Sequence, residues 1–151
     1  MSVVFNLTEK SIVLAEIQES FKDFSHGAQL FFLGVVRNNN NGKKVRAVSY
    51  DVHRELASKV FQEICQEVYN SNVSKKPESN INILLIHRVG TLQVGECSVL
   101  IAVGAPHRDE VYRISRHIIE ELKTRAPIWK KEHYEDGESE WLKGHELCGT
   151  L

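Results

Sequence analysis

The sequence predicts an α+β protein with a mostly antiparallel sheet and about three helices. Three segments carry apolar residues at helical spacing, and they alternate with short segments whose apolar pattern is typical of strands. Glycine- and asparagine-rich stretches separate the strands, and no proline- or serine-rich linker divides the chain. We therefore expect a single domain over residues 1–151, which is long enough to bury a substantial core.

The first half of the chain predicts two helices and a hairpin. Apolar residues between Leu14 and Phe24 recur at helical spacing and predict a helix over about residues 11–22. The segment QLFFLGVVR, residues 29–37, is apolar on both faces and predicts a buried strand interrupted by a glycine. Alternating residues 48–52 follow the loop NNNNGKK, so these two strands are expected to pair as a hairpin. Apolar residues from Leu56 to Val68 then mark a second helix.

The second half predicts two paired strands, a helix and a last strand. After a polar loop at residues 71–80, the strands INILLIHR and CSVLIAVG are joined through Gly90 and Gly95. Helical spacing from Val111 to Leu122 predicts a third helix, which must end before Pro127 because proline restricts the residue preceding it. The strand IWKKEHY follows, and an Asp-Gly turn leads toward Trp141.

Composition excludes several broad classes of protein. The chain is 42% hydrophobic and 26% charged, with a formal net charge of −1, so its overall field predicts neither nucleic-acid nor membrane attraction. No secretory signal is visible, and no apolar run approaches the ~18 residues of a membrane span. Cys65, Cys97 and Cys148 are few, odd in number and widely spaced, which favours a cytoplasmic location without structural disulfides.

The sequence lacks the motifs of several common enzyme classes. There is no GxSxG elbow, Walker A loop, GxGxxG fingerprint, HExxH or CxxC motif. None of the seven histidines is spaced as a metal ligand, so we expect no metal and no cofactor. His87 ends a strand and His117 lies within a helix, and both are interpreted as structural residues. The cysteines lie in apolar patterns and are interpreted as small buried side chains.

Four cations gather around Pro127 in the segment KTRAPIWKKE, residues 123–132. Strand alternation places Lys130 on one face with Ile128 and Glu132, and Lys131 on the other face with Trp129, a tryptophan that we expect in the core. The two lysines therefore cannot both enter one pocket. Lys123 ends the third helix, where it either stabilises the helix C-terminus or, partly desolvated among cations, serves as an acid, base or nucleophile. Spacing alone leaves both readings of Lys123 open.

Three further cations lie elsewhere in the chain. His107 and Arg108 begin the third helix, where backbone N–H groups and the helix dipole favour an anion and disfavour positive charge. A solvated helix end is one interpretation, and a bound phosphate or carboxylate is the other. Arg37 closes a buried strand, so its guanidinium is expected to emerge at the sheet edge.

Five segments, in this order, resemble the large catalytic subunit of molybdopterin synthase. They are FFLGVVRNNNNGKKV, IHRVGTLQVGE, VGAPHRDEVY, ELKTRAPIWKKE and DGESEW. The resemblance extends from about Gly27 to Trp141, most of the chain. Its longest part, LKTRAPIWKKE, is highly specific, and a chance match to all five in order is not credible.

The resemblance implies an α/β hammerhead-type fold and a homodimer at the centre of a heterotetramer. Two small ubiquitin-like sulfur-carrier subunits would flank the dimer. It also implies a reaction, in which cyclic pyranopterin monophosphate receives two sulfurs and becomes molybdopterin. The sulfur would arrive as a thiocarboxylate on the carrier's C-terminal glycine, which agrees with the lack of a catalytic cysteine or metal motif in this chain.

Site residues also follow from the resemblance. Lys123 and Lys130 would be catalytic and contact the substrate, assisting proton transfer and stabilising oxyanions. Arg37, His107 and Arg108 would hold the substrate phosphate.

Four neighbours of these cations complete the implied substrate site. Lys131 and Glu132 match the family's binding stretch, although alternation indicates that one of them contributes through its backbone. Val35 and Val36 would line the site through the main chain. The family commonly has an arginine after the C-terminal tryptophan, where this chain offers Lys143 and His145.

Helix geometry adds a prediction about the dimer. Arg108 and Lys123 lie fifteen residues apart on one helix, a span of about 22 Å. If both serve one site, the simplest arrangement is a two-fold dimer in which each site combines Lys123 of one protomer with Arg108 of its partner.

Two rival functions stay open from the residues alone. One is a hydrolase or transferase that acts on a phosphorylated heterocycle without any sulfur carrier. The other is a non-catalytic module whose basic groove binds an acidic peptide tail or single-stranded RNA, for which exposed aromatic residues should interleave with the cations.

Overall fold

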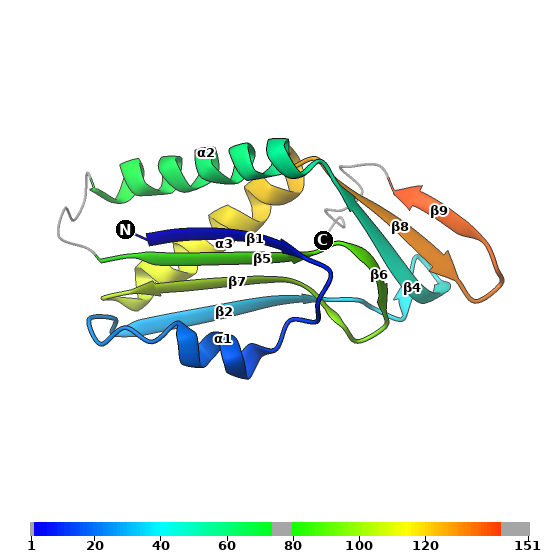
Figure 1. Cartoon of the computed structure of the whole chain (residues 1–151), viewed down its shortest axis with the longest axis horizontal. Coiled ribbons are helices and arrows are strands. Elements are labelled where there is room, and N and C mark those ends of the chain that lie inside the picture. The colour runs from blue at the N-terminus through cyan, green and yellow to red at the C-terminus, as the bar shows by residue number, and fades with distance from the viewer. Residues whose placement is uncertain (1, 74–79, 143–151) are drawn as a thin grey trace.

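A computed structural model of the chain describes residues 2–73 and 80–142 (Figure 1). Four strands form the first sheet, in the order β1-β5-β7-β2. β1 runs parallel to β5, whereas β5 and β2 each run antiparallel to β7. The bounds of these strands are β1 Ser2–Thr8, β2 Ala28–Val35, β5 Asn82–Arg88 and β7 Cys97–Ala105.

A second sheet lies beyond one end of the first, on the right in Figure 1. Its path is β3-β4-β8-β9, and β6 pairs with β4 beside that path. All of its pairings are antiparallel, and Tyr50 of β4 is aligned with Lys130 of β8. The bounds of these strands are β3 Asn39–Asn40, β4 Lys43–Val52, β6 Gly90–Gln93, β8 Ile128–Tyr134 and β9 Ser139–Leu142.

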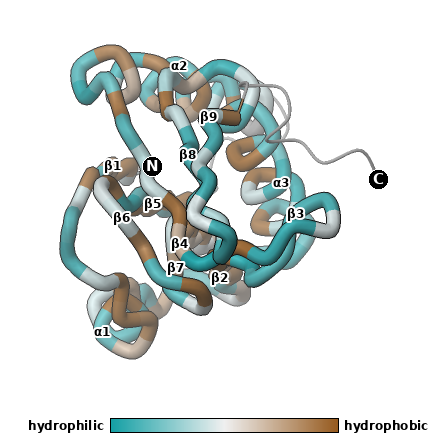
Figure 2. The backbone as a smooth tube through the Cα atoms, turned by 90° about the vertical axis from the view of Figure 1, so that its right-hand side faces the viewer, coloured by the Kyte–Doolittle hydropathy of each residue, from teal (hydrophilic) through white to brown (hydrophobic). Residues whose placement is uncertain are grey.

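Two long helices, α2 (Arg54–Val73) and α3 (Arg108–Arg125), pack against the first sheet. Each is amphipathic, and hydrophobic and hydrophilic residues alternate along both helices in Figure 2. Their apolar faces meet the inward-facing side chains of β5 and β7 in one buried core. This core includes Phe61, Ile64, Val68, Ile83, Leu85, Ile101, Val103, Ile114, Ile118 and Leu122.

A smaller core belongs to the second sheet. It contains Val36, Val45, Val48, Leu92 and Tyr134, each at most 5% exposed. The chain passes between the two cores at the ends of β2, β5 and α3, which is where the candidate site lies.

The α+β class, the mostly antiparallel sheets and the second and third helices are confirmed. The third helix ends at Arg125, and Ala126 takes extended backbone angles before Pro127, as expected. In α2 the buried face runs through Ala57, Phe61 and Ile64, whereas Leu56 is 46% exposed at the helix start.

The predicted hairpin between residues 29–37 and 48–52 is wrong. β2 pairs with β7, and β4 pairs with β3, β6 and β8. Asn41 and Gly42 both have positive φ angles, 49° and 79°, which suits a tight turn that folds β4 back on the two-residue β3 instead. The asparagine-rich loop therefore contains a short hairpin of its own, and β2 joins the other sheet.

The N-terminal region also departs from the prediction. β1 was not expected, although Val3, Phe5 and Leu7 do alternate along it. Helix α1 spans Leu14–Ser20, shorter than expected, and buries none of its residues. Phe24 is fully exposed rather than part of a helical face.

The end of α1 is set by a polar turn that follows it. The Asp23 carboxylate accepts hydrogen bonds from the Ser25 hydroxyl and backbone N–H, at 2.6 and 2.9 Å, and these bonds hold the pKa of Asp23 at about 2. Because such a turn competes with helical backbone, the helix cannot extend through Asp23.

Candidate active site

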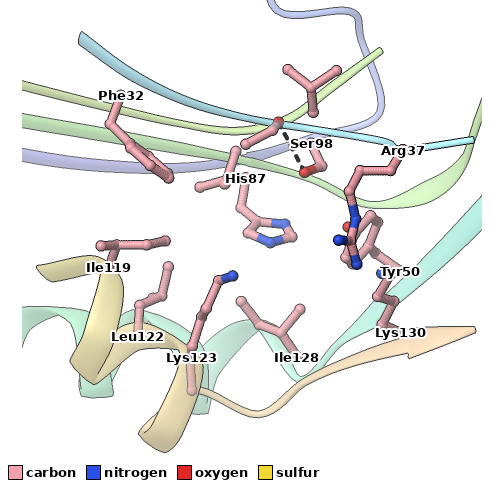
Figure 3. A pocket seen from close by; sticks show the side chains of 14 residues that line it. Phe32, Arg37, Tyr50, His87, Ser98, Ile119, Leu122, Lys123, Ile128 and Lys130 are labelled. Carbon is pink, nitrogen blue, oxygen red and sulfur yellow. Dashed lines mark hydrogen bonds between the residues drawn. The ribbon is translucent and has the colours of Figure 1, made fainter. Parts of the chain in front are cut away.

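A cavity of about 340 Å³ lies where the two sheets meet the C-terminal end of α3 (Figure 3). Its walls come from β2, β4, β5, β7, α3 and β8. Apolar side chains such as Phe32, Ile119 and Leu122 form one side, and polar side chains project from the other elements. A partly enclosed cavity that combines an apolar wall with convergent polar groups is typical of a small-molecule site.

Gly34 shapes the wall of the cavity that β2 contributes. A Cβ atom at this position would lie 2.7 Å from Cγ1 of Val99, so a larger residue would force the two strands apart. The β2–β7 register shifts between Gly34 and Val35, which is the signature of a β-bulge. The interruption that the sequence predicts at Gly34 is therefore this bulge, and it leads the chain to Val35 and Arg37 at the cavity.

Pro127 brings two lysines to the same cavity. Because α3 must end before the proline, the chain turns at Ala126 and enters β8 at Ile128. Lys123 lies in the last helical turn and Lys130 on the new strand, and both line the cavity. Figure 3 shows the Lys123 side chain reaching inward from the helix.

Lys130 is held by a buried carboxylate. Its Nζ donates to Oε1 of Glu132 at 2.7 Å, and the Glu132 side chain is 2% exposed. The same carboxylate accepts from Nδ2 of Asn40 at 3.0 Å and from the Tyr134 hydroxyl at 3.1 Å. Burial by itself would raise the pKa of Glu132, but these hydrogen bonds, chiefly the one from Lys130, hold that pKa below its ordinary value.

Arg37 joins the same network at the cavity. Its Nη2 donates to Oδ1 of Asn40 at 3.2 Å. Asn40 therefore links Arg37 to Glu132, and through Glu132 to Lys130. Two cations from distant parts of the sequence are thus positioned by one amide and one carboxylate.

His87 and Tyr50 also line the cavity, although the sequence analysis assigned neither to the site. The His87 ring meets the Tyr50 ring edge to face, with centroids 5.1 Å apart. Burial, with a smaller contribution from the charge of Lys123, lowers the pKa of His87 to about 4. Burial also raises the pKa of Tyr50. Alternation in β4 revealed the strand at Tyr50, but no local signal marks which residues face a cavity formed by six elements.

His107 and Arg108 lie at the opposite end of α3 from Lys123. They line a separate hollow with Gly27, Pro106 and Asp109, and neither lines the cavity of the same chain. The His107 N–H donates to Oε2 of Glu110 at 3.3 Å, so part of the helix start is satisfied internally. The separation expected from helix geometry is therefore present in the fold.

The remaining predicted residues have different surroundings. Lys131 lies on the face opposite Lys130, with its Nζ 5.6 Å from the ring centre of Trp141. Val36 is buried in the smaller core, and its N–H donates to the Glu96 carbonyl at 3.0 Å. Lys143 and His145 lie outside the described residues.

Trp129 is 46% exposed, so the prediction that it belongs to the core is wrong. Trp129 lies on the outer face of β8, whereas Glu132 and Tyr134 on the inner face are buried. No cluster of three or more potential metal ligands occurs in residues 2–73 and 80–142. No helix within those residues is long and apolar enough to cross a membrane.

The cavity carries a surplus of positive charge. Arg37, Lys123 and Lys130 line it, and the one carboxylate that contacts this set is Glu132 among the described residues. The described residues of its lining include no cysteine. This geometry is that of a site for an anionic small molecule, with lysines available for proton transfer and charge stabilisation.

Comparisons with known proteins agree with this class. The family model described as "MoaE protein" matches residues 7–125. The chain is 40% identical over 138 residues to the molybdopterin synthase catalytic subunit of Nostoc sp., covering 91% of this chain and 81% of the relative. It is 44% identical to that of Synechococcus elongatus, covering 91% of this chain and 80% of the relative.

Solved structures share the fold. Molybdopterin synthase from Staphylococcus aureus superposes with a TM-score of 0.75 at 32% identity, covering 94% of this chain and 96% of that one. A chain from the complex of subunits 1 and 2 of the molybdopterin-converting factor of Helicobacter pylori superposes with a TM-score of 0.70 at 18% identity, covering 94% of this chain and 89% of that one, which supports the fold alone.

Fold and cavity together define an α+β protein with a cationic cavity that can hold a small anion. More particularly, the chain belongs to the family of molybdopterin synthase catalytic subunits. The resemblance on which the sequence analysis relied is thereby confirmed.

Proposed function

We propose that this chain is the catalytic subunit of a molybdopterin synthase. It converts cyclic pyranopterin monophosphate to molybdopterin by inserting two sulfurs from the C-terminal thiocarboxylate of a small ubiquitin-like carrier subunit. The observation that carries the proposal is the convergence of Lys123, Lys130 and Arg37 on one cavity whose described lining has no thiol. A site without its own sulfur nucleophile, but rich in cations, suits a reaction in which a partner delivers the sulfur.

The cations divide the proposed work by position. Arg37 lies at the cavity with a guanidinium suited to a phosphate oxygen. Lys123 and Lys130 assist proton transfer at the pterin side chain and stabilise the negative charge that develops on oxygen. Lys131, Glu132, Val35 and Val36 belong to the proposed binding stretch, in which Glu132 acts by holding Lys130.

A homodimer completes the proposed site. His107 and Arg108 are too far along α3 to reach the cavity of their own chain, since the fifteen residues to Lys123 span about 22 Å. A two-fold axis would bring these two residues to the cavity of the partner protomer and add a second phosphate-binding group. Carrier subunits would flank this dimer in a heterotetramer, as the family resemblance implies.

Complementation tests the composite site. An Arg108→Ala chain and a Lys123→Ala chain should each be inactive alone. Mixed dimers of the two should regain one intact site and part of the activity. If subunit exchange is proven by mass spectrometry and no activity returns, every cation of a site belongs to a single chain.

Reconstitution tests the function itself. Purified chain, thiocarboxylated carrier and cyclic pyranopterin monophosphate should together yield molybdopterin, which is detected after oxidation by its fluorescence. Carrier that ends in an ordinary carboxylate is the matched control and should yield none. Binding of the pterin without any sulfur transfer would instead favour a phosphate-heterocycle enzyme that needs no carrier.

The proposed reaction takes place in the cytoplasm. Cys65 and Cys97 are both free thiols, as a reducing compartment requires. Burial raises the pKa of Cys65 to about 12, so this thiol is not a nucleophile at neutral pH.

A further inference from the structure

The two lysines of the cavity have different partners. Lys130 donates to the buried carboxylate of Glu132 at 2.7 Å. Among residues 2–73 and 80–142, no carboxylate forms an ion pair with Lys123. The polar side chain that faces Lys123 across the cavity is the imidazole of His87, as Figure 3 shows.

The hydrogen bond at Nδ1 sets the tautomer of His87. Nδ1 lies 2.7 Å from the backbone oxygen of Arg88, and a carbonyl oxygen can only accept. Nδ1 must therefore carry the proton, which leaves Nε2 of the neutral ring with a free lone pair. The residue is 6% exposed, so the surroundings of the ring favour the neutral form.

We propose that His87 is a positioning residue for Lys123, whose ammonium group donates to the unprotonated Nε2 of His87 during catalysis. The inference deepens the proposed function and rests on it. Ordering a lysine side chain costs rotamer entropy, and a fixed acceptor opposite Nζ offsets part of that cost. The His87 ring is itself fixed by Arg88 and by its edge-to-face contact with Tyr50.

A neutral acceptor suits Lys123 better than a carboxylate does. A carboxylate at this place would repel the phosphate of the substrate and the thiocarboxylate of the carrier, and it would hold the proton of Lys123 firmly. Neutral imidazole orients the ammonium group without adding negative charge. The geometry thus assigns proton transfer to Lys123 and fixed charge stabilisation to Lys130.

Two substitutions of His87 distinguish the role of Nδ1 from the role of Nε2. His87→Asn places an amide N–H near the position of Nδ1, so it can keep the bond to Arg88 but loses the acceptor that faces Lys123. His87→Gln reaches the position of Nε2 with an amide oxygen but gives up the bond to Arg88. We expect roughly a tenfold lower kcat for His87→Asn, with KM and Tm nearly unchanged, and we expect His87→Gln to retain more of kcat despite a lower Tm.

The opposite ranking overturns the proposal. If His87→Asn keeps the full kcat while His87→Gln loses both kcat and Tm, His87 serves only the backbone of β5. The pH profile supplies a further readout, because a protonated ring cannot accept. Among the described residues, the other charged and titratable groups that line the cavity with His87 are Lys123 from α3, Lys130 from β8, Tyr50 from β4 and Arg37 beyond β2.

Nitrogen NMR tests the pairing without any enzymatic activity. In the isolated chain labelled with ¹⁵N-histidine, His87 should show a protonated Nδ1 and an unprotonated Nε2 at neutral pH. Lys123→Met should raise the pKa of His87 and shift its Nε2 resonance, because a neighbouring positive charge is lost. Arg125→Gln, two residues away on the same helix, should leave both the pKa of His87 and its Nε2 resonance unchanged.

An unchanged His87 spectrum in Lys123→Met would refute the pairing. This result would not affect the proposed function, which reconstitution tests separately. Conversely, if the chain formed no molybdopterin while Lys123→Met shifted the spectrum, the proposed function would fail and the contact between the two side chains would stand.

Discussion

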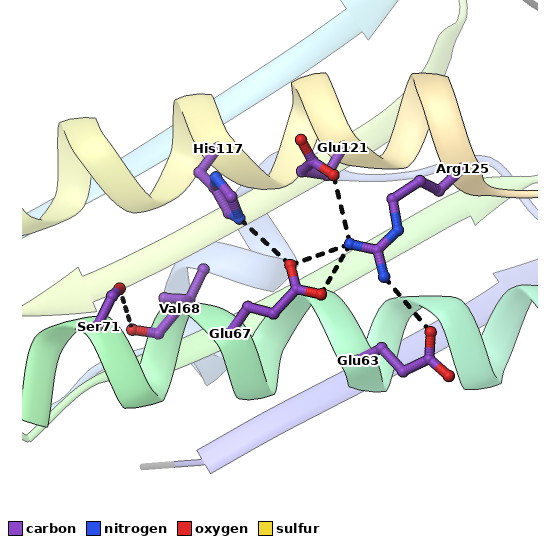
Figure 4. Close-up of polar contacts among 7 residues, drawn as sticks. All are labelled: Glu63, Glu67, Val68, Ser71, His117, Glu121 and Arg125. Carbon is purple, nitrogen blue, oxygen red and sulfur yellow. Dashed lines mark hydrogen bonds and ion pairs between the residues drawn. The ribbon is translucent and has the colours of Figure 1, made fainter.

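The cavity and the interface between α2 and α3 use cations in opposite ways. At the interface, Arg125 is surrounded by carboxylates, with Nη1 2.9 Å from both Glu67 oxygens and 3.3 Å from Glu121 (Figure 4). Its Nη2 lies 3.4 Å from Glu63, and His117 approaches Glu67 at 3.9 Å. In the cavity, the Glu132 carboxylate pairs with Lys130, and among the described residues no carboxylate forms an ion pair with Arg37 or Lys123.

This difference distinguishes a cation that stabilises the fold from cations that are available to a ligand. Arg125 satisfies its donors within the fold and joins two helices, so no ligand is needed to explain it. At the cavity, Arg37 and Lys123 have no carboxylate partner among the described residues and are exposed, so both are available to an anion. Lys123 and Arg125 are two residues apart, yet Lys123 lies at the cavity and Arg125 lies in the interface between α2 and α3.

The largest effect is expected from the cavity lysines. Lys123→Ala and Lys130→Ala should each lower the rate of molybdopterin formation roughly 10³-fold, because each removes a group that we propose acts on the reacting atoms. Tm should change little for Lys123→Ala, which is exposed at a helix end. Lys131→Ala, on the opposite face of β8, should cost at most a few-fold. Wild-type rates in either cavity variant would remove that lysine from the mechanism.

Acid should destabilise the protein through His87. Its pKa is about 4 in the folded protein, against 6.5 ordinarily, so the unfolded chain binds a proton first as the pH falls. Stability that is full above pH 6.5 should therefore decline toward pH 4, by on the order of 3 kcal/mol from this group. Denaturant unfolding at several pH values measures this change in the free energy of unfolding. His87→Asn, which cannot titrate, should flatten this part of the profile, and an unchanged profile would contradict the assignment.

Glu132→Gln should have an intermediate effect on both function and folding. The substitution keeps the size of the side chain but removes the charge that holds Lys130, leaving a cation that is 18% exposed without its partner. We expect unfolding free energy to fall by about 1–3 kcal/mol and product formation to fall roughly tenfold. Chemical denaturation and the reconstituted assay measure these separately. A variant with normal activity would show that Lys130 needs no carboxylate.

The smallest effect is expected at the interface. Arg125→Gln removes ion pairs whose side chains are 30% to 49% exposed and therefore screened by water, so it should cost no more than about 1 kcal/mol of stability. Molybdopterin formation should stay within two-fold of wild type. A loss of activity as large as that of Lys123→Ala, with folding intact, would break the distinction between the two regions.

Local chemistry determined a large part of the site. Proline at 127 ends α3 whatever surrounds it, and the two-residue period of β8 places Lys130 and Lys131 on opposite faces. The separation of Arg108 from Lys123 also follows from helix rise alone. These features depend on residues close in sequence, so they could be predicted without the tertiary structure.

Long-range pairing could not be predicted in this way. Residues 29–37 carry a strand pattern that is compatible with several partners, and the Asn41–Gly42 turn that redirects β4 was hidden in a polar run. The N-terminal strand β1 was overlooked because its alternation is short, and it is stabilised by pairing with β5, which lies more than seventy residues away in the sequence.

The class of fold, the boundaries around Pro127 and the candidate anion-binding residues could thus be predicted from the order of the amino acids. Which cations share a cavity and which are neutralised depends on how the elements pack together. In the sequence, Arg125 and Lys123 are both cations in the last turn of the third helix. In the fold, α2 supplies carboxylates to Arg125, whereas β5 places a neutral histidine opposite Lys123. The physical reason is that the protonation and partners of a charged group depend on its neighbours in space, and these come from elements far apart in the chain.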